Sequence, residues 1–192
     1  MASLYLLDTN AYFLIFQTPK TNPQINLEVK LFDADGLSFY ISEITSLEIH
    51  SVLGKYSRGV SPQKCLCERN IIDGAHVVRC LKQWVVPGRK KMNPKVFRDI
   101  RKMILDIEGG RGDIKAEVLI VDSDVVGEAR NLLYKYADVY NFGSHDSMIA
   151  GSIIATRKKL GIDLTLVTSD KGLKAVLKDE GIPYYDPRDA NN

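Results

Sequence analysis

Short apolar runs alternate along this chain of 192 residues with longer stretches whose apolar residues recur at helical spacing. The run at 164–168 is typical of a buried strand, and the stretch 123–137 is typical of an amphipathic helix. Strands that alternate with helices predict an α/β fold of three layers, α/β/α, around a mainly parallel sheet of four or five strands. The predicted strands are 4–8, 37–41, 118–121, 164–168 and 183–185, and the predicted helices are 9–16, 26–32, 43–56, 94–107, 123–137, 145–159 and 171–180.

The middle of the chain departs from this alternation. From 62 to 115 we find no clear period apart from the helix at 94–107, so we predict a single domain, 1–192, with a basic insertion at about 58–116. Between Arg79 and Lys115 eleven Lys and Arg stand against four Asp and Glu, a net charge of +7 in a chain whose total is +2. Such segregation favours a phosphate-rich partner, and a solvated lysine-rich helix is the alternative.

Four acidic residues are predicted to meet at one edge of the sheet. Asp8 and Asp170 follow apolar strands, and ligand sites in parallel sheets gather at the carboxyl ends of strands. Glu48 shares a helix side with apolar neighbours, and Asp146 begins the apolar side of another helix. Like charges about 4 Å apart cost roughly 4 kcal/mol at an effective dielectric near 20, so the cluster favours a divalent cation, Mg²⁺ or Mn²⁺. Each acid has a local alternative, as a helix cap or an ordinary first-turn or surface carboxylate.

Four segments in this order resemble the PIN domain, a family of metal-dependent nucleases. They are Leu-Leu-Asp-Thr-Asn at 6–10, Ile-Ser-Glu-Ile-Thr-Ser-Leu-Glu at 41–48, His-Asp-Ser-Met-Ile-Ala-Gly at 145–151 and Leu-Val-Thr-Ser-Asp at 166–170. The resemblance implies a PIN-like fold and covers about 3–57 and 117–186. It implies that the metal cluster and catalytic residues are Asp8, Glu48, Asp146 and Asp170, with Asn10, Thr168 and Ser169 as supporting polar residues.

The function implied by the resemblance is hydrolysis of RNA phosphodiester bonds by metal-activated water. The bacterial VapC-like members of the family are toxins of toxin–antitoxin pairs, so a small antitoxin protein and a homodimer are expected partners. Within the basic insertion, Arg89, Lys90 and Lys91 are expected to contact the RNA backbone. A non-catalytic RNA-binding module of the same type is the alternative.

Other patterns indicate weaker alternatives. Phe32-Asp33-Ala34-Asp35-Gly36 resembles the nucleophile loop of haloacid-dehalogenase-type phosphatases, but no apolar strand precedes it, so we interpret it as a turn. Four sulfur and imidazole side chains lie near one another in the sequence and could bind zinc: Cys65, Cys67, His76 and Cys80. The C-x-C spacing at the start of this group is atypical of zinc sites, so we interpret the cysteines as buried thiols. Trp84 is predicted to belong to a local core. The sequence shows no signal-peptide pattern and no apolar run long enough for a membrane span, so a cytoplasmic location is expected.

Overall fold

A computed structural model describes residues 4–33, 36–74 and 76–189. Tertiary contacts divide the chain into two compact units. The larger unit combines Met1–Ser51 with Ile100–Asn192, and the smaller unit is Val52–Asp99. The smaller unit therefore begins and ends earlier in the chain than the predicted insertion at 58–116.

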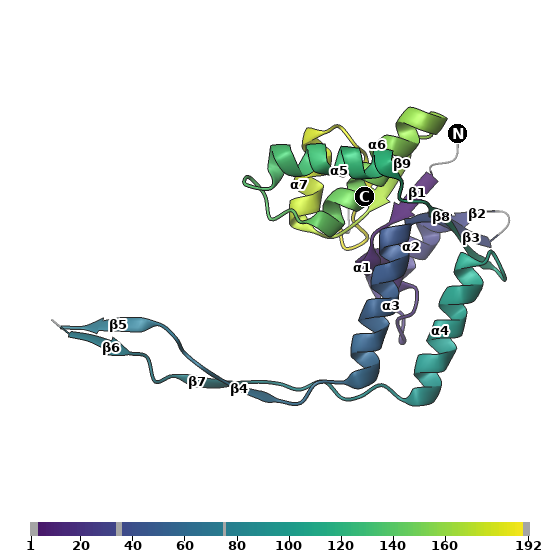
Figure 1. Ribbon diagram of the computed structural model, residues 1–192. Helices are drawn as coiled ribbons and strands as arrows, with labels where there is room; N and C mark the ends of the chain where they lie inside the picture. The colour runs from purple at the N-terminus through teal and green to yellow at the C-terminus, as the bar shows by residue number, and fades with distance from the viewer. Residues whose placement is uncertain (1–3, 34–35, 75, 190–192) are drawn as a thin grey trace. The chain divides into compact units, whose positions relative to one another are not determined.

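The larger unit is built on a parallel sheet of five strands, in the order β10-β9-β1-β3-β8 (Figure 1). A further two-residue strand, β2 (Phe32–Asp33), pairs with the start of β3 in the antiparallel direction. This architecture confirms the predicted mainly parallel sheet. The five parallel strands are β1 (Leu4–Leu7), β3 (Gly36–Ser42), β8 (Ile114–Leu119), β9 (Leu164–Val167) and β10 (Tyr184–Tyr185).

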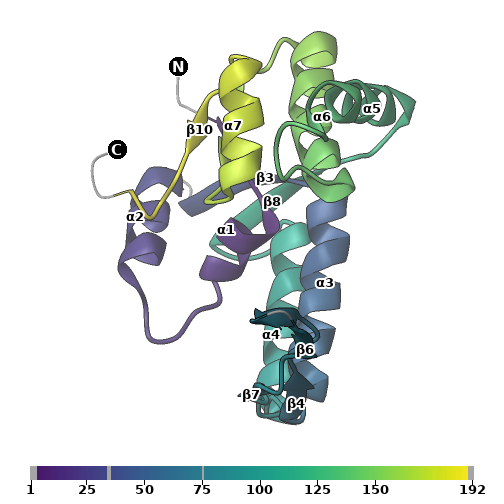
Figure 2. The same ribbon diagram turned by 90° about the vertical axis from the view of Figure 1, so that its left-hand side faces the viewer.

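Helices cover both faces of the sheet, which confirms the three predicted layers (Figure 2). Leu6 and Leu166 pack into a core formed with α5 (Ser123–Tyr136), α6 (Ser144–Leu160) and α7 (Lys171–Asp179). The neighbouring residues Leu7 and Val167 are also fully buried and must point to the other face, because side chains alternate along a strand. Burial on both faces explains why the central strands read as continuous apolar runs. The remaining helices of this unit's N-terminal part are α1 (Thr9–Leu14) and α2 (Asn22–Leu31).

Strand β8 corrects the prediction for 118–121. The strand begins at Ile114 and pairs with β3 from Leu37↔Ile114 to Ser42↔Leu119. Lys115 and Glu117 are exposed, whereas Ala116 is buried. A strand covered mainly on one face shows alternating polar and apolar residues rather than an apolar run, so the apolar run at 118–121 marks only the end of β8.

The helix α6 begins one residue before the predicted helix at 145–159. Gly143 is the N-cap residue, and Ser144 is the first helical residue. The Asp146 carboxylate accepts a hydrogen bond from the Gly143 N–H, Oδ2 to N 3.3 Å. Asp146 therefore stands at the third helical position, where a carboxylate can satisfy a free N–H and meets the positive end of the helix dipole.

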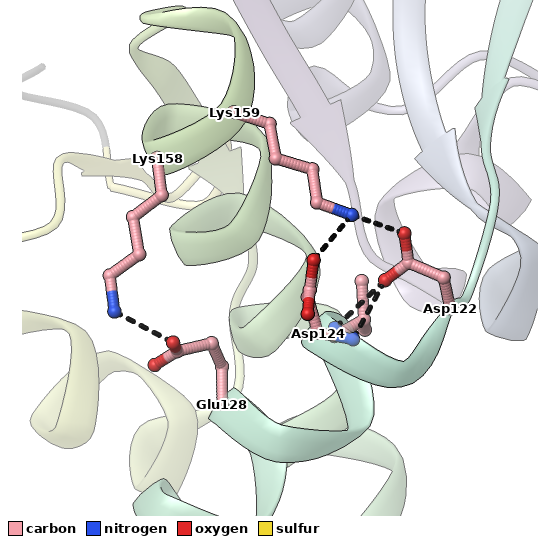
Figure 3. A network of polar contacts seen from close by, with 6 residues as sticks. Asp122, Asp124, Glu128, Lys158 and Lys159 are labelled. Carbon is pink, nitrogen blue, oxygen red and sulfur yellow. Dashed lines mark hydrogen bonds and ion pairs between the residues drawn. The ribbon is translucent and has the colours of Figure 1, made fainter.

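Ion pairs join the start of α5 to the end of α6 (Figure 3). Lys158 Nζ lies 2.7 Å from Glu128 Oε1, and Lys159 contacts the carboxylates of Asp122 and Asp124. Asp122 is also the N-cap residue of α5, where its Oδ1 accepts hydrogen bonds from two backbone N–H groups. Exposed ion pairs each contribute about 0–1 kcal/mol to the free energy of unfolding. These pairs therefore add little to the apolar packing between the two helices.

The smaller unit contains a two-stranded antiparallel ribbon, which we call the ribbon (residues 63–86). Strand β4 (Gln63–Leu66) pairs with β7 (Gln83–Val86), and β5 (Asn70–Asp73) pairs with β6 (His76–Arg79) (Figure 1). Backbone hydrogen bonds Cys67 N–H to Lys82 O and Cys80 N–H to Arg69 O, both 2.9 Å, carry one register through the whole ribbon. The sequence showed no period here because apolar residues occur on both ribbon faces.

Two long helices border the ribbon in the chain, α3 (Glu43–Arg58) and α4 (Pro94–Glu108), and each crosses the boundary between the units. The thiols and Trp84 of the ribbon do not form the predicted buried core. Trp84 is 51% exposed, and the three cysteines are half-buried. Within the described residues, no helix is long and apolar enough to cross a membrane.

Candidate functional site

The first carboxylate, Asp8, stands where β1 ends and α1 begins. Its Oδ1 accepts a hydrogen bond from the Ala11 N–H at 2.6 Å, so it caps α1 as the sequence allowed. Its backbone N–H donates to Val167 O at 3.1 Å, and its carboxylate is hydrogen-bonded to the side chain of Thr168. The side chain is almost fully buried, with 4% of the residue exposed. Asp8 is therefore fixed beside the end of the neighbouring strand β9.

Asp170 follows the neighbouring strand β9 and lies on the same side of the site as that strand. Strands β1 and β9 are parallel and in register, with Leu7 opposite Val167, so the residues that follow them lie at the same sheet edge. The Asp170 N–H donates to Thr168 Oγ1 at 3.1 Å, and its Oδ1 caps α7 by accepting from the Leu173 N–H at 2.8 Å. Thr168 thus joins the two acids, because its hydroxyl bonds the Asp8 carboxylate and the Asp170 backbone.

Glu48 reaches the site from α3. Its Oε2 accepts a hydrogen bond from Thr9 Oγ1 at 2.5 Å, which joins α3 to the start of α1. Its Oε1 lies 3.8 Å from Nδ1 of His145, a largely exposed residue next to Asp146 in the first turn of α6. The Glu48 side chain is 33% exposed, which places it at the edge of the buried side of α3 rather than within it.

The charges of the four acids act on one another. Burial raises the pKa of Asp8 to about 6, against lowering by hydrogen bonds from Thr168 and Ala11, and the charges of Asp146 and Asp170 raise it further. Burial also raises the pKa of Asp146, and the charges of Asp170 and Glu48 add to that rise. Carboxylates from four distant segments of the sequence therefore form one electrostatically coupled cluster, which we call the acidic cluster (Asp8, Glu48, Asp146 and Asp170).

The donor chemistry of the acidic cluster fits a hard divalent cation, which prefers carboxylate and hydroxyl oxygens. No three carboxylate, imidazole or thiol groups among the described residues lie close enough together, as they stand, to coordinate one ion. Asp8 and Asp170 each use one carboxylate oxygen to cap a helix. Mg²⁺ commonly takes only one or two protein carboxylates and keeps several waters, so the cluster suits an ion held partly through water.

The other predicted site residues have different surroundings. Thr168 contacts the acidic cluster at Asp8 and Asp170. Ser169 instead donates its hydroxyl to Oδ1 of the buried Asp186 at 2.6 Å. Asn10 is exposed on α1. The sequence interpretation missed two residues that hydrogen-bond to predicted site residues: Thr9, which donates to Glu48, and Asp186, which accepts from Ser169. Thr9 follows Asp8 directly. It could have been identified from the sequence as a hydroxyl residue in the first turn of a helix that begins where a strand ends.

The basic residues of the smaller unit also differ from one another. Arg89 donates from its Nη2 to the carbonyl of Lys55 at 2.9 Å, and its guanidinium lies 4.1 Å from the ring centroid of Tyr56. These contacts give Arg89 a structural role within the smaller unit. Lys90 and Lys91 are exposed. Of the three predicted RNA contacts, the two lysines are therefore better placed to meet phosphate.

The alternative sites receive little support. Cys65, Cys67 and Cys80 share one ribbon face with His76, but they do not belong to a three-ligand group in the described part of the chain. The phosphatase-like turn includes 34–35, which lie outside the described residues, so the structure gives no geometry for that loop.

Comparison with known proteins adds no identification. The sequence matches no protein-family model, and it matches no curated protein. The acidic cluster and the motif resemblance are therefore the features that bear on the function of this chain.

Proposed function

We propose that this chain is a divalent-metal-dependent ribonuclease of the PIN type, with its active site at the acidic cluster. The observation that carries the proposal is the convergence of Asp8, Asp146 and Asp170, with Glu48 at the edge, from four separate segments. Acidic neighbours that raise the pKa of buried carboxylates at a sheet edge, as they do for Asp8 and Asp146, are characteristic of sites built for a cation or a reaction. The resemblance to PIN domains is the reason for proposing RNA as the substrate. It is also the reason for proposing a toxin role with a small antitoxin protein as partner.

The residues of the site would have two roles, to hold the metal ion and to fix the carboxylates that hold it. Asp8 and Asp146, with Asp170 and Glu48 beside them, would hold Mg²⁺ or Mn²⁺. When bound, such an ion would activate water and neutralise the charge that develops on the phosphoryl oxygens. Thr168 would hold the Asp8 carboxylate in place, and Thr9 would do the same for Glu48. Two of the four acids are anchored on the backbone as helix caps, so the site would be largely formed before substrate arrives.

Metal binding can be measured without RNA. We expect Mg²⁺ or Mn²⁺ to raise the melting temperature, because an ion that binds only the folded chain at 100 times its Kd contributes about 2.7 kcal/mol. Asp146→Asn should lose most of this rise. Asp138→Asn, at an exposed position after α5, should keep it. Melting curves over a metal titration, together with cleavage of a labelled RNA, test the proposal.

A non-catalytic RNA-binding module is the second candidate. It is favoured by one finding, that no three ligands in the described ranges stand within reach of a single ion. The same experiment separates the two. A chain that binds RNA but gains no stability from either metal, and cleaves no RNA in their presence, would be the binding module.

The exposed lysines provide a test of RNA binding. Replacing Lys90 and Lys91 by Gln should weaken binding across RNA sequences and reduce the slope of log K against log salt by about 1.4, since each single-strand phosphate contact contributes about 0.7. Gln replacements at Lys20 and Lys178, outside the basic segment, are the control and should leave the slope unchanged. Arg89 is kept in this experiment because it packs on Tyr56. An unchanged slope in the Lys90 and Lys91 variant would exclude these lysines as phosphate contacts.

A further inference from the structure

Two cysteines of the ribbon are diagonal neighbours on one of its faces. The Cys67 N–H donates to Lys82 O at 2.9 Å, so these two residues are opposite each other in the ladder. The Cys80 N–H donates to Arg69 O at 2.9 Å, which makes Arg69 and Cys80 the next pair along the same face. The thiols of Cys67 and Cys80 are hydrogen-bonded to each other. The ribbon therefore brings two sulfur atoms from its two strands into contact.

Cations occupy the positions opposite the two thiols. A hydrogen bond from the Lys82 backbone lowers the pKa of the Cys80 thiol, and so do the hydrogen bond from Cys67 and the charge of Lys82. Cys80 is half-buried rather than enclosed. Reactive cysteines are partly exposed thiols beside cations, because the thiolate is the nucleophile and a nearby positive charge favours it. Cys80 thus has the surroundings of a nucleophile, with a second thiol placed to react with its first product.

We propose that Cys67 and Cys80 form a dithiol site that low-molecular-weight disulfides oxidise to an intramolecular disulfide. In the first step the Cys80 thiolate attacks one sulfur of the small disulfide RSSR, its S–S bond breaks, and one RS⁻ leaves and takes up a proton. In the second step Cys67 loses its proton to solvent, attacks the Cys80 sulfur and displaces the second RS⁻, which also takes up a proton. The chain loses two hydrogen atoms and RSSR becomes two RSH, so the cysteines are oxidised and the small disulfide is reduced.

The geometry of the ribbon allows this bond to form and to be reduced again. A disulfide needs Cα atoms within about 7 Å, and diagonal positions of an antiparallel pair are about 7–8 Å apart. Two-stranded ribbons twist strongly, which shortens one diagonal of the ladder, and the contact between the two thiols marks the short one. The described side chains of the ribbon are exposed apart from the half-buried cysteines, so no packed layer among them resists the small movement that closes the bond. Exposed disulfides are readily reduced, so the oxidation is reversible.

The third cysteine of the ribbon cannot replace either partner. Cys65 is opposite Trp84 in the ladder, so it faces an indole ring rather than a cation. It lies about 14 Å along the ribbon from the level of Cys80, at about 3.4 Å per residue. On its own strand, Cys65 and Cys67 project in the same direction from Cα atoms about 6.8 Å apart, so their sulfur atoms do not converge. The dithiol site is therefore one pair out of three cysteines, and it shares no residue with the proposed nuclease site.

The first test treats the reduced full chain with oxidised glutathione near neutral pH and counts free thiols by alkylation. The count should fall from three to one, and peptide mass spectrometry should locate a single bond, between Cys67 and Cys80. Cys67→Ser should instead accumulate a glutathione adduct on Cys80, because the second thiol is absent. Cys65→Ser is the matched control and should form the same bond as the wild type. Circular dichroism verifies that both variants fold.

The second test removes a cation beside the thiols. In the Cys67→Ser background, Lys82→Gln should slow formation of the Cys80 adduct about threefold, because less of the thiol is ionised without the nearby charge. Lys64→Gln changes a lysine on the opposite face of the ribbon and should leave the rate unchanged.

Three outcomes would overturn the proposal. The first is a wild-type chain that keeps its three free thiols after hours in millimolar oxidised glutathione. The second is a bond between Cys65 and Cys67, or between two copies of the chain, in place of the predicted one. The third is a Cys67→Ser variant that carries glutathione equally on Cys65 and Cys80, since Cys80 would then have no special reactivity.

Discussion

Asp8→Asn is expected to reduce RNA cleavage at least 100-fold and, in chelator, to raise the stability of the fold above about pH 6. The loss of activity follows from the proposed function, because removing one preorganised charged group at a reacting centre typically costs 10²–10³ in rate. The gain in stability follows from the electrostatics of the site. Asn keeps the capping of α1, since Asn and Asp are comparable N-cap residues.

The sign of the stability change can be worked out from the pKa of Asp8. Burial and neighbouring acids raise this pKa from 3.8 to about 6, so the folded chain holds the proton more tightly than the unfolded chain. Stability therefore falls as the pH rises from about 4 to about 6 and stays reduced above that range. The penalty is of order 3 kcal/mol, from about 1.36 kcal/mol per pKa unit. Asn carries no charge and should remove most of this penalty at pH 8 but little of it at pH 4.

Asp122→Asn is the matched control, because Asp122 also caps a helix, α5. The hydrogen bond from Lys159 and the bonds from the α5 backbone lower its pKa, so its stabilising contribution is present above about pH 4 and is lost as the pH falls through the lowered pKa. Asp122→Asn should therefore reduce stability at pH 8, the opposite sign to Asp8→Asn. Urea unfolding at pH 4 and pH 8 measures both. A large loss of stability in Asp8→Asn at pH 8 would make Asp8 a structural residue only.

Gly151→Ala is expected to destabilise the fold by about 2 kcal/mol, as overpacking of a close contact does. Gly151 lies in the buried middle of α6, where a Cβ would stand 2.8 Å from Val125 O and 3.0 Å from Ala129 N of α5. Both atoms belong to the α5 backbone, so the two helices would have to separate. At about 2–4 °C per kcal/mol for a chain of this size, the melting temperature should fall by roughly 4–8 °C.

Gly127→Ala is the control for the helix-propensity part of this effect. Gly127 lies in α5, and a Cβ there would meet no atom within 4 Å. Alanine is preferred over glycine inside a helix by about 1 kcal/mol, so this variant should be as stable as the wild type or more stable. Thermal melts of the two variants side by side decide the question. Equal melting temperatures would mean that α5 and α6 can move apart without cost.

Local sequence patterns predicted most of the larger unit. The runs that form β1 and β9 are mostly apolar because helices cover both sheet faces, so Leu6, Leu7, Leu166 and Val167 are all fully buried. The predicted helix at 94–107 matches α4, Pro94–Glu108, because its apolar residues recur at helical spacing. The ribbon could not be predicted in this way, since a two-stranded element with apolar residues on both faces has no period that identifies a covered side.

The sequence by itself determined the strand-and-helix alternation and the position of each acid at a strand end or in a helical stretch, because these properties depend on residues within a few positions of one another. Only the tertiary structure decided which acids meet. The pairing of β1 with β9 brings Asp8 beside Thr168, and Thr9 bonds Glu48 across 39 positions of the chain. The tertiary structure also places Ser169 beside the buried Asp186, which accepts a hydrogen bond from its hydroxyl. These contacts depend on strand order and on the packing of α3 near α1, which no local period encodes, because the energy that selects them comes from burial between distant segments.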